Sequence, residues 1–175
     1  MTKECYDNMR QQYQPKRIRV LFVGESRPAG GTFFYRGDSN LCRYTQQAFE
    51  KACGRNSDTP SEFLASFMSK GCYLDDLCLE PVNRNDARRR RKQRNAGVCS
   101  LATRMRAYPY RPDAVICVMR AIEGHVRRAM EGLNPRDVLF YCAPFPAQGH
   151  QREYVEQLTA ALIDLSNKGI LDLDC

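Results

Sequence analysis

Four short apolar runs recur along this 175-residue chain, and a segment with helical spacing of apolar residues follows each of them. The runs span 18–23, 72–79, 113–119 and 137–142. They are too short for helices, and the first is rich in β-branched residues, which is typical of a buried parallel strand. Their alternation with helices predicts a three-layer α/β/α sandwich around a four-stranded parallel sheet with right-handed crossovers.

Local end signals place helices between these strands. Ser39 is positioned to cap a helix that runs to about Cys53. Thr59 and Glu62 form a capping box for the next helix, with Pro60 at its first position. A basic connection from 84 is expected to lead into a helix through 102–108, and further helices are expected up to 130 and over 152–168.

The first strand runs into a Gly-rich loop with three consecutive aromatic residues, Phe33, Phe34 and Tyr35. In a parallel sheet this loop meets the loops after the second and fourth strands at the carboxyl edge, where open α/β sheets bind ligands. Adjacent glycines let backbone approach a ligand, and aromatic rings offer a stacking surface. The alternative is a packed loop whose aromatics only cover the sheet end.

Charge and composition indicate one domain, 1–175, that binds nucleic acid. The net charge is +7, and a basic run over 88–94, extended by Arg104 and Arg106, concentrates it. Arginines readily contact phosphates, although a charge run can also be only a solvated face. Residues 1–16 are expected to form a polar extension. No apolar run is long enough for a membrane and no signal peptide is visible, so we expect a cytoplasmic protein, and a monomer.

The nine cysteines contain no C-x-x-C pair, and His125 and His150 are the two histidines. We therefore expect reduced thiols and neither metal nor other cofactor, with a zinc or iron–sulfur site as the alternative.

Three segments, VGESRPAGGTFFY, YLDDLCLEPVN and PFPAQGHQ, together resemble the uracil-DNA glycosylase superfamily, in the same order along the chain. The resemblance implies that family's four-stranded parallel sheet, base flipping from DNA and cleavage of the N-glycosidic bond without metal. Gly24 matches the glycine of the family's first motif, and Glu25 matches the acidic residue that helps to activate water. The stacking aromatic of that loop corresponds to Phe33 or Phe34.

The other two motifs depart from the family pattern. The base-reading Asn at the end of a strand is replaced by Asp75 and Asp76, and the His-Pro-Ser motif by residues 143–146, so that His150 is displaced. The candidates for catalysis are Glu25, Ser26 and His150; for base binding, Phe33, Phe34, Tyr35, Asn40, Asp75 and Asp76; for DNA contact, Arg88, Arg89, Arg90, Arg91, Lys92, Arg94, Pro144, Phe145, Pro146 and Gln148.

These residue types suit the cleavage of an N-glycosidic bond. Cleavage puts positive charge on the sugar and negative charge on the leaving base, so a carboxylate near the sugar lowers the barrier, and Glu25 is the candidate. An ionised carboxylate at Asp75 or Asp76 only accepts hydrogen bonds, which favours the amine of a cytosine-type base over uracil. Because ordinary cytosine must be spared, we expect a modified cytosine, such as a phage hypermodified base, in repair or anti-phage defence.

Two other classes of function remain open at this stage. Ser26 after a strand and glycine is similar to the nucleophile of a serine hydrolase, but Pro28 replaces the second glycine of that motif. A non-catalytic module that binds nucleic acid or nucleotides could use the same aromatics and arginines. A Schiff-base mechanism is not expected, because no lysine stands in the three motifs, so the predicted enzyme is a monofunctional glycosylase.

Overall fold

The chain folds around a parallel four-stranded sheet, as the alternation of strands and helices predicted. In the computed structural model, residues 2–56, 59–133 and 137–173 are described. Along these residues the elements are α1 (Lys3–Gln12), β1 (Val20–Gly24), η1 (Phe34–Arg36), α2 (Asn40–Cys53), α3 (Pro60–Ser69), β2 (Cys72–Asp76), α4 (Ala87–Ala107), β3 (Ala114–Cys117), η2 (Arg120–Ile122), α5 (Glu123–Met130), η3 (Glu131–Leu133), β4 (Leu139–Cys142) and α6 (Gln151–Asn167).

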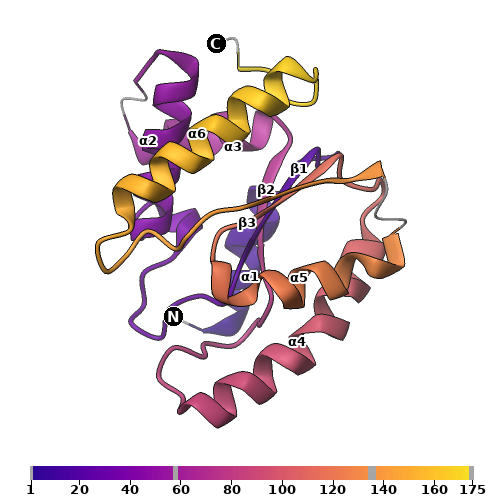
Figure 1. Cartoon of the computed structure of the whole chain (residues 1–175). Coiled ribbons are helices and arrows are strands. Elements are labelled where there is room, and N and C mark those ends of the chain that lie inside the picture. Colours follow the sequence, from indigo (N-terminus) through magenta and orange to yellow (C-terminus); the bar gives the residue numbers. More distant parts are fainter. Residues whose placement is uncertain (1, 57–58, 134–136, 174–175) are drawn as a thin grey trace.

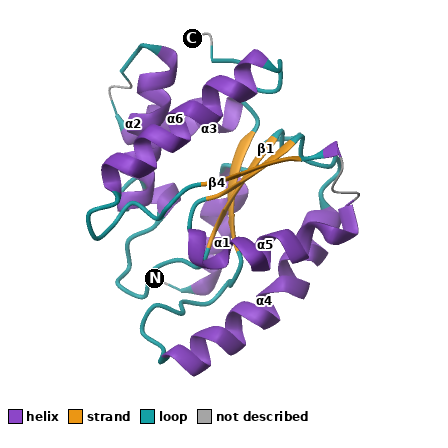
Figure 2. Cartoon of the chain, in the orientation of Figure 1, coloured by secondary structure: helices purple, strands orange, loops and turns teal. Residues whose placement is uncertain are grey.

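Helices cover both faces of the sheet, which confirms the three-layer sandwich. α2, α3 and α6 lie on one face, and α4 and α5 lie on the other (Figure 1). Figure 2 shows the strands running together between these two groups, with α1 close to one end of the sheet. Over the residues that are described, no helix is both long enough and apolar enough to cross a membrane.

The strand order is β2-β1-β3-β4, so β1 and β3 lie in the middle of the sheet. All pairs are parallel, with Val20 opposite both Cys72 and Ala114. The chain leaves β1 towards one edge and later returns to β3 on the other side. In a doubly wound sheet, the loops of the two neighbouring strands diverge where the chain reverses direction in this way. The crevice between these loops can hold a ligand.

Capping signals in the sequence correspond to real helix ends. The Ser39 side chain accepts a hydrogen bond from the Cys42 N–H at the start of α2. Thr59 and Glu62 form the complete capping box of α3, and Pro60 is its first residue. Both predictions are confirmed, because capping depends on residues three positions apart rather than on the tertiary fold.

The N-terminal segment, which was expected to be a polar extension, forms for the most part the helix α1, and this helix packs against the rest of the chain. Tyr6 is buried, and its ring meets the Phe33 ring edge-on at 5.0 Å between centroids. Arg10, from the last turn of α1, is buried as well. The segment is too polar to show a clear apolar stripe, and the buried Tyr6 and Arg10 hold it together with Met9 and Tyr13, which pack against the core.

The basic run is also helical, where a connection was expected. Residues 88–94 form the first two turns of α4, a helix of 21 residues. Arg, Lys, Gln and Ala all have high helix propensity, and the Asp86 side chain caps the helix by accepting from the Arg89 N–H. The predicted strand 72–79 is shorter, because β2 ends at Asp76, opposite the last residue of β1.

Candidate functional site

A cavity of about 380 Å³ lies at the carboxyl ends of the strands. Its wall combines the end of β1 with the loop after it, the end of β2, the residues after β3, the first turn of α4 and the loop after β4. Gly24, Asp76, Arg90, Met119 and Phe145 represent these five segments. The loops that the sequence predicted to converge therefore do converge, and the volume falls in the range of about 300–1,000 Å³ that is usual for small-molecule sites.

The two neighbouring aspartates of β2 point to opposite faces of the sheet, as successive strand residues do. Asp76 lines the cavity, whereas Asp75 does not. Asp75 accepts hydrogen bonds from Arg104 Nε at 2.8 Å and from the Tyr108 hydroxyl at 3.0 Å, on the α4 side. Asp76 is therefore the candidate for base reading that faces the cavity. Asp75 instead connects β2 to α4 through its hydrogen bonds.

Asp76 is buried and is held by Arg10 of α1. Arg10 Nη2 donates to Asp76 Oδ2, and Arg10 Nη1 donates to Asp75 Oδ1 at 3.2 Å. The other oxygen, Asp76 Oδ1, lies over Gly24, where a Cβ atom would come within 2.6 Å of it. Since Gly24 and Asp76 both line the cavity, Oδ1 is the oxygen available to a ligand, and only glycine at 24 leaves room for it.

Burial raises the pKa of the Asp76 carboxyl above its ordinary value, because loss of hydration outweighs the attraction of Arg10. Arg10 itself stays charged, since the two carboxylates raise its pKa although burial acts in the opposite direction. Arg10 thus fixes the Asp76 carboxylate through Oδ2, and the absence of a side chain at Gly24 leaves room for Oδ1 at the cavity wall.

Glu25 follows Gly24 and is the second carboxylate of the cavity. Arg90 donates to it through Nε at 2.7 Å and through Nη2 at 2.5 Å, and Arg94 Nε donates at 2.5 Å. Burial alone would raise the pKa of the Glu25 carboxyl, but these hydrogen bonds more than offset it and hold the pKa below its ordinary value. Glu25 is therefore a carboxylate, and it cannot serve as a proton donor in this arrangement.

Two of the three predicted aromatic residues reach the cavity. Phe33 and Phe34 line it, although both are nearly fully buried. Tyr35 does not line it, because its ring turns to the free edge of β2. There the Tyr35 hydroxyl donates to the Leu74 carbonyl and accepts from the Leu74 N–H, which satisfies backbone groups of the edge strand. Tyr35 is thus a structural residue, and any stacking falls to the two phenylalanines.

The polar residues Ser26, Asn40 and Asn83 also line the cavity. Ser26 lines the cavity, and its hydroxyl accepts a hydrogen bond from the Val82 N–H at 3.2 Å. Asn83 Oδ1 accepts from the Ala29 N–H at 3.0 Å, which ties the loop after β2 to the loop after β1. Asn40, at the start of α2, is exposed and lines the cavity as well.

The loop after β4 contributes one residue of the predicted set to the wall. Phe145 lines the cavity and is 39 % exposed, whereas Pro144 and Pro146 are buried and cannot present a surface to DNA. Gln148 is exposed and has a positive φ of 53°. His150 lies outside the cavity, is exposed, and contacts Glu153 at 3.2 Å. The structure therefore gives His150 no place beside Glu25 or Asp76.

The basic run divides into two groups. Arg90 and Arg94 turn inward to Glu25, while the remaining members are exposed on the first turns of α4: Arg88, Arg89, Arg91 and Lys92. Arg104, which was expected to extend the basic surface, instead contacts Asp75. A positively charged surface is thus retained next to the cavity, although it has fewer free charges than the sequence indicated.

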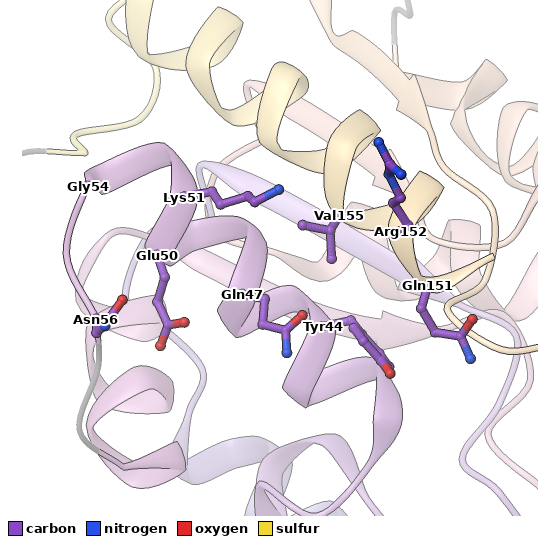
Figure 3. A pocket seen from close by; sticks show the side chains of 9 residues that line it. All are labelled: Tyr44, Gln47, Glu50, Lys51, Gly54, Asn56, Gln151, Arg152 and Val155. Atoms are coloured by element: carbon purple, nitrogen blue, oxygen red, sulfur yellow. The ribbon is translucent and has the colours of Figure 1, made fainter. Parts of the chain in front are cut away.

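A larger and shallower groove of about 690 Å³ lies between α2 and α6 (Figure 3). Its walls carry mixed polar side chains, such as Gln47, Lys51 and Arg152. It contains neither of the two buried carboxylates and does not reach the strand ends, so we place the candidate site in the smaller cavity.

Comparison with known proteins adds no assignment. A scan of the sequence against models of protein families finds no match, and a search of curated proteins finds no significant relative.

Arg10 is the functional candidate that the sequence did not reveal. Two aspartates inside an apolar strand required a buried cationic partner, because an unpaired buried charge is very costly. The sequence indicated that such a partner was needed. It did not indicate which of the 27 lysines and arginines this partner is, and Arg10 lies 65 residues before Asp75.

Proposed function

We propose that this protein is a DNA glycosylase that flips a modified pyrimidine into the cavity and hydrolyses its N-glycosidic bond. The observation that carries the proposal is the meeting of Glu25 and Asp76 in one small cavity with Phe33 and Phe34, beside a basic helix. Aromatic rings replace the stacking that a flipped base loses, and arginines on α4 suit the DNA backbone. No other described part of the chain combines these features.

Glu25 is the group proposed to act on the sugar. It is ionised and lies directly after the strand end, so it can stabilise positive charge on the sugar or orient a water molecule. The bond between base and C1′ breaks with its electrons leaving on the base, and the oxygen of water forms the new bond to C1′. The proton of that water passes to Glu25 or to solvent, and the product is an abasic site.

Asp76 is the group proposed to read the base. Its Oδ1 offers an acceptor to the cavity, and Arg10 occupies Oδ2. The exocyclic amine of cytosine can donate to this oxygen, whereas O4 of uracil would face a carboxylate with no donor. A cytosine-type base is therefore favoured.

The biological setting follows from the substrate in this proposal. A modified cytosine of the phage type would make the protein a defence enzyme, and a damaged pyrimidine would make it a repair enzyme. In either case we propose that it works in the cytoplasm, on DNA, as a monomer and without a cofactor.

The proposal is tested by mass spectrometry of free bases released from a panel of DNAs. The panel contains uracil, unmodified cytosine, hydroxymethylcytosine and glucosylated hydroxymethylcytosine, each in single-stranded and double-stranded form. We expect release of one cytosine-type base by the wild type, and a loss of at least about 100-fold in Glu25→Gln. The matched control is Glu156→Gln, which removes the same charge from the exposed face of α6 and should release the base at the wild-type rate.

A non-catalytic module that binds nucleic acid is the second candidate, and one observation favours it. Glu25 is fully engaged by Arg90 and Arg94, so the arrangement seen here does not expose a free carboxylate. Tight, salt-dependent binding with no base released from any DNA of the panel would support this candidate. A serine hydrolase has little support, because neither histidine lines the cavity with Ser26.

A further inference from the structure

Glu25 and its two arginines form an ion triad with a net charge of +1, because one carboxylate faces two guanidinium groups. A sugar that becomes positive next to this triad would meet a net positive charge rather than a negative one. Glu25 can therefore perform its proposed role only if at least one arginine leaves it.

The two sides of the triad differ in their access to solvent. The Glu25 side chain is 8 % exposed, whereas the side chains of Arg90 and Arg94 are 31 % and 17 % exposed. Both arginines lie on one face of α4, four residues apart, next to the exposed Arg91 and Lys92. An anion that approaches the basic surface can thus reach the guanidinium groups without entering the core.

A phosphodiester is the anion that suits these groups best. Guanidinium groups bind phosphate through two parallel hydrogen bonds, the geometry that Arg90 now uses on Glu25. Arg90 also lines the cavity, so a phosphate next to a flipped nucleotide would lie within reach of it. The arginines would then exchange one bidentate anion for another with little loss of hydrogen bonding.

We infer that Arg90 and Arg94 form a phosphate-binding site that Glu25 occupies in the free protein and that the DNA backbone takes over on binding. This inference rests on the proposed function in taking DNA as the ligand. Binding of the backbone releases the Glu25 carboxylate, so the site becomes competent only when a phosphate is in place. No covalent step is involved, since the exchange moves only hydrogen bonds.

The first experiment measures binding of an unmodified fluorescent oligonucleotide by anisotropy, at several salt concentrations, for the full-length wild type and Glu25→Gln. In the wild type the two arginines must leave Glu25 before they bind the backbone, whereas in Glu25→Gln no carboxylate competes for them. We therefore expect Glu25→Gln to bind about tenfold more tightly at low salt. The slope of log affinity against log salt should be the same in both proteins, because the arginines contact the same phosphates in both complexes.

Two controls separate this effect from a general change of charge. Glu156→Gln removes an equal charge from an exposed pair with Arg152 on α6 and should leave the affinity unchanged. In the wild-type background, Arg90→Gln should remove about 0.7 of the slope for a single strand and about 0.9 for a duplex, and Arg152→Gln should remove none.

A second measurement uses the wild type alone and so does not depend on the folding of a variant. In ¹⁵N NMR spectra, the Nε–H signals of Arg90 and Arg94 should shift when the oligonucleotide is added. Addition of deoxycytidine monophosphate or inorganic phosphate distinguishes a DNA backbone from a free phosphate as the ligand. A shift with the oligonucleotide at micromolar concentration, and none with the small anions, supports the inference.

The inference is overturned if Arg90→Gln leaves the salt slope of the wild type unchanged, or if Glu25→Gln steepens it by about 1.4 to 1.8, because the two arginines would then contact phosphate only when Glu25 is removed. It is also overturned if both Nε–H signals stay in place when DNA is bound. The triad would then be a fixed structural element. These outcomes are independent of base release. Exchange without base release would refute the glycosylase and keep the phosphate site. Base release with no loss of slope in Arg90→Gln would keep the glycosylase and refute the exchange.

Discussion

Under the proposed function, replacement of Asp76 by Asn is expected to invert the base preference, because of the hydrogen bond from Arg10. Arg10 donates to Oδ2 of Asp76, and it can only donate. In Asp76→Asn the amide oxygen must therefore turn towards Arg10, which leaves the NH₂ group over Gly24 and facing the cavity. An acceptor for a base amine becomes a donor for a base carbonyl, with almost no change of volume.

The size of the effect follows from the hydrogen bond that is exchanged. A hydrogen bond to a charged group contributes about 1.5–3 kcal/mol, and leaving the group unsatisfied costs a similar amount. Release of a cytosine-type base should fall by about 10- to 150-fold, and release of uracil should rise by a similar factor. The ratio of the two rates should thus change by about 10²- to 10⁴-fold.

The assay is competitive base release under single-turnover conditions, from oligonucleotides that contain hydroxymethylcytosine or uracil. Asp75→Asn is the matched control, because it makes the same chemical change at the neighbouring residue, outside the cavity. Asp75→Asn should lower the free energy of unfolding without changing the ratio of the two release rates. An unchanged ratio in Asp76→Asn, or an equal change in both variants, would refute the role of Asp76.

The pH dependence of the same ratio provides an independent check. Burial raises the pKa of Asp76 above its ordinary value of 3.8, so protonation begins at a higher pH than in an exposed aspartate. Once Oδ1 carries a proton it donates, as the Asn amide does. The wild-type ratio should therefore move towards uracil as the pH falls, while that of Asp76→Asn stays flat. Titration of Glu25 cancels in the ratio, since both substrates use it.

Three further predictions concern the cavity, α1 and the ion triad. Gly24→Ala should abolish base release, because its Cβ would come within 2.6 Å of Asp76 Oδ1, while Gly30→Ala, in open space, should release base normally in the same assay. Tyr6→Ala should lower the free energy of unfolding in urea by about 3–5 kcal/mol; a loss below about 1 kcal/mol would mean that α1 is not docked. The Glu25 pKa is lowered from 4.5, so its stabilising contribution is present above that value and is lost as the pH falls through the folded pKa. The difference in unfolding free energy between wild type and Glu25→Gln should thus be constant at neutral pH and shrink below about pH 4.5; a difference that persists to pH 2 would contradict the ion pairing.

The fold was predictable because its signals are local. Short apolar runs mark the strands, and a capping box such as that of Thr59 and Glu62 needs only four consecutive residues. The place of the cavity was predictable for a related reason, since parallel strands bring their carboxyl ends to one edge. Glu25 and Phe33 were therefore found from their position after β1.

The partners of the charged groups were not predictable, because they depend on distant residues and on side-chain direction. Arg90 and Arg94 were assigned to DNA as part of a uniform basic run, yet the helical period turns both of them inward while Arg91 remains exposed. Asp75 and Asp76 could not be told apart until the strand register placed Asp76 opposite Gly24. Both cases required the backbone before the chemistry could be assigned.

The two carboxylates of the cavity are held by arginines, and the exposure of those arginines separates their roles. The Arg10 side chain is 8 % exposed and bridges two aspartates, so no phosphate can displace it without undocking α1. Arg90 and Arg94 are reachable from the basic surface and hold one carboxylate between them. In the proposed mechanism, the fixed contact of Arg10 with Asp76 suits recognition, because the acceptor must keep one orientation to discriminate between bases. The exchangeable contact of Arg90 and Arg94 with Glu25 suits the proposed reaction, because the charge of Glu25 would be needed only when DNA is bound. In a titration with oligonucleotide, the Nε–H signals of Arg90 and Arg94 should therefore shift at a lower oligonucleotide concentration than the Nε–H signal of Arg10. The opposite order would contradict this division of roles.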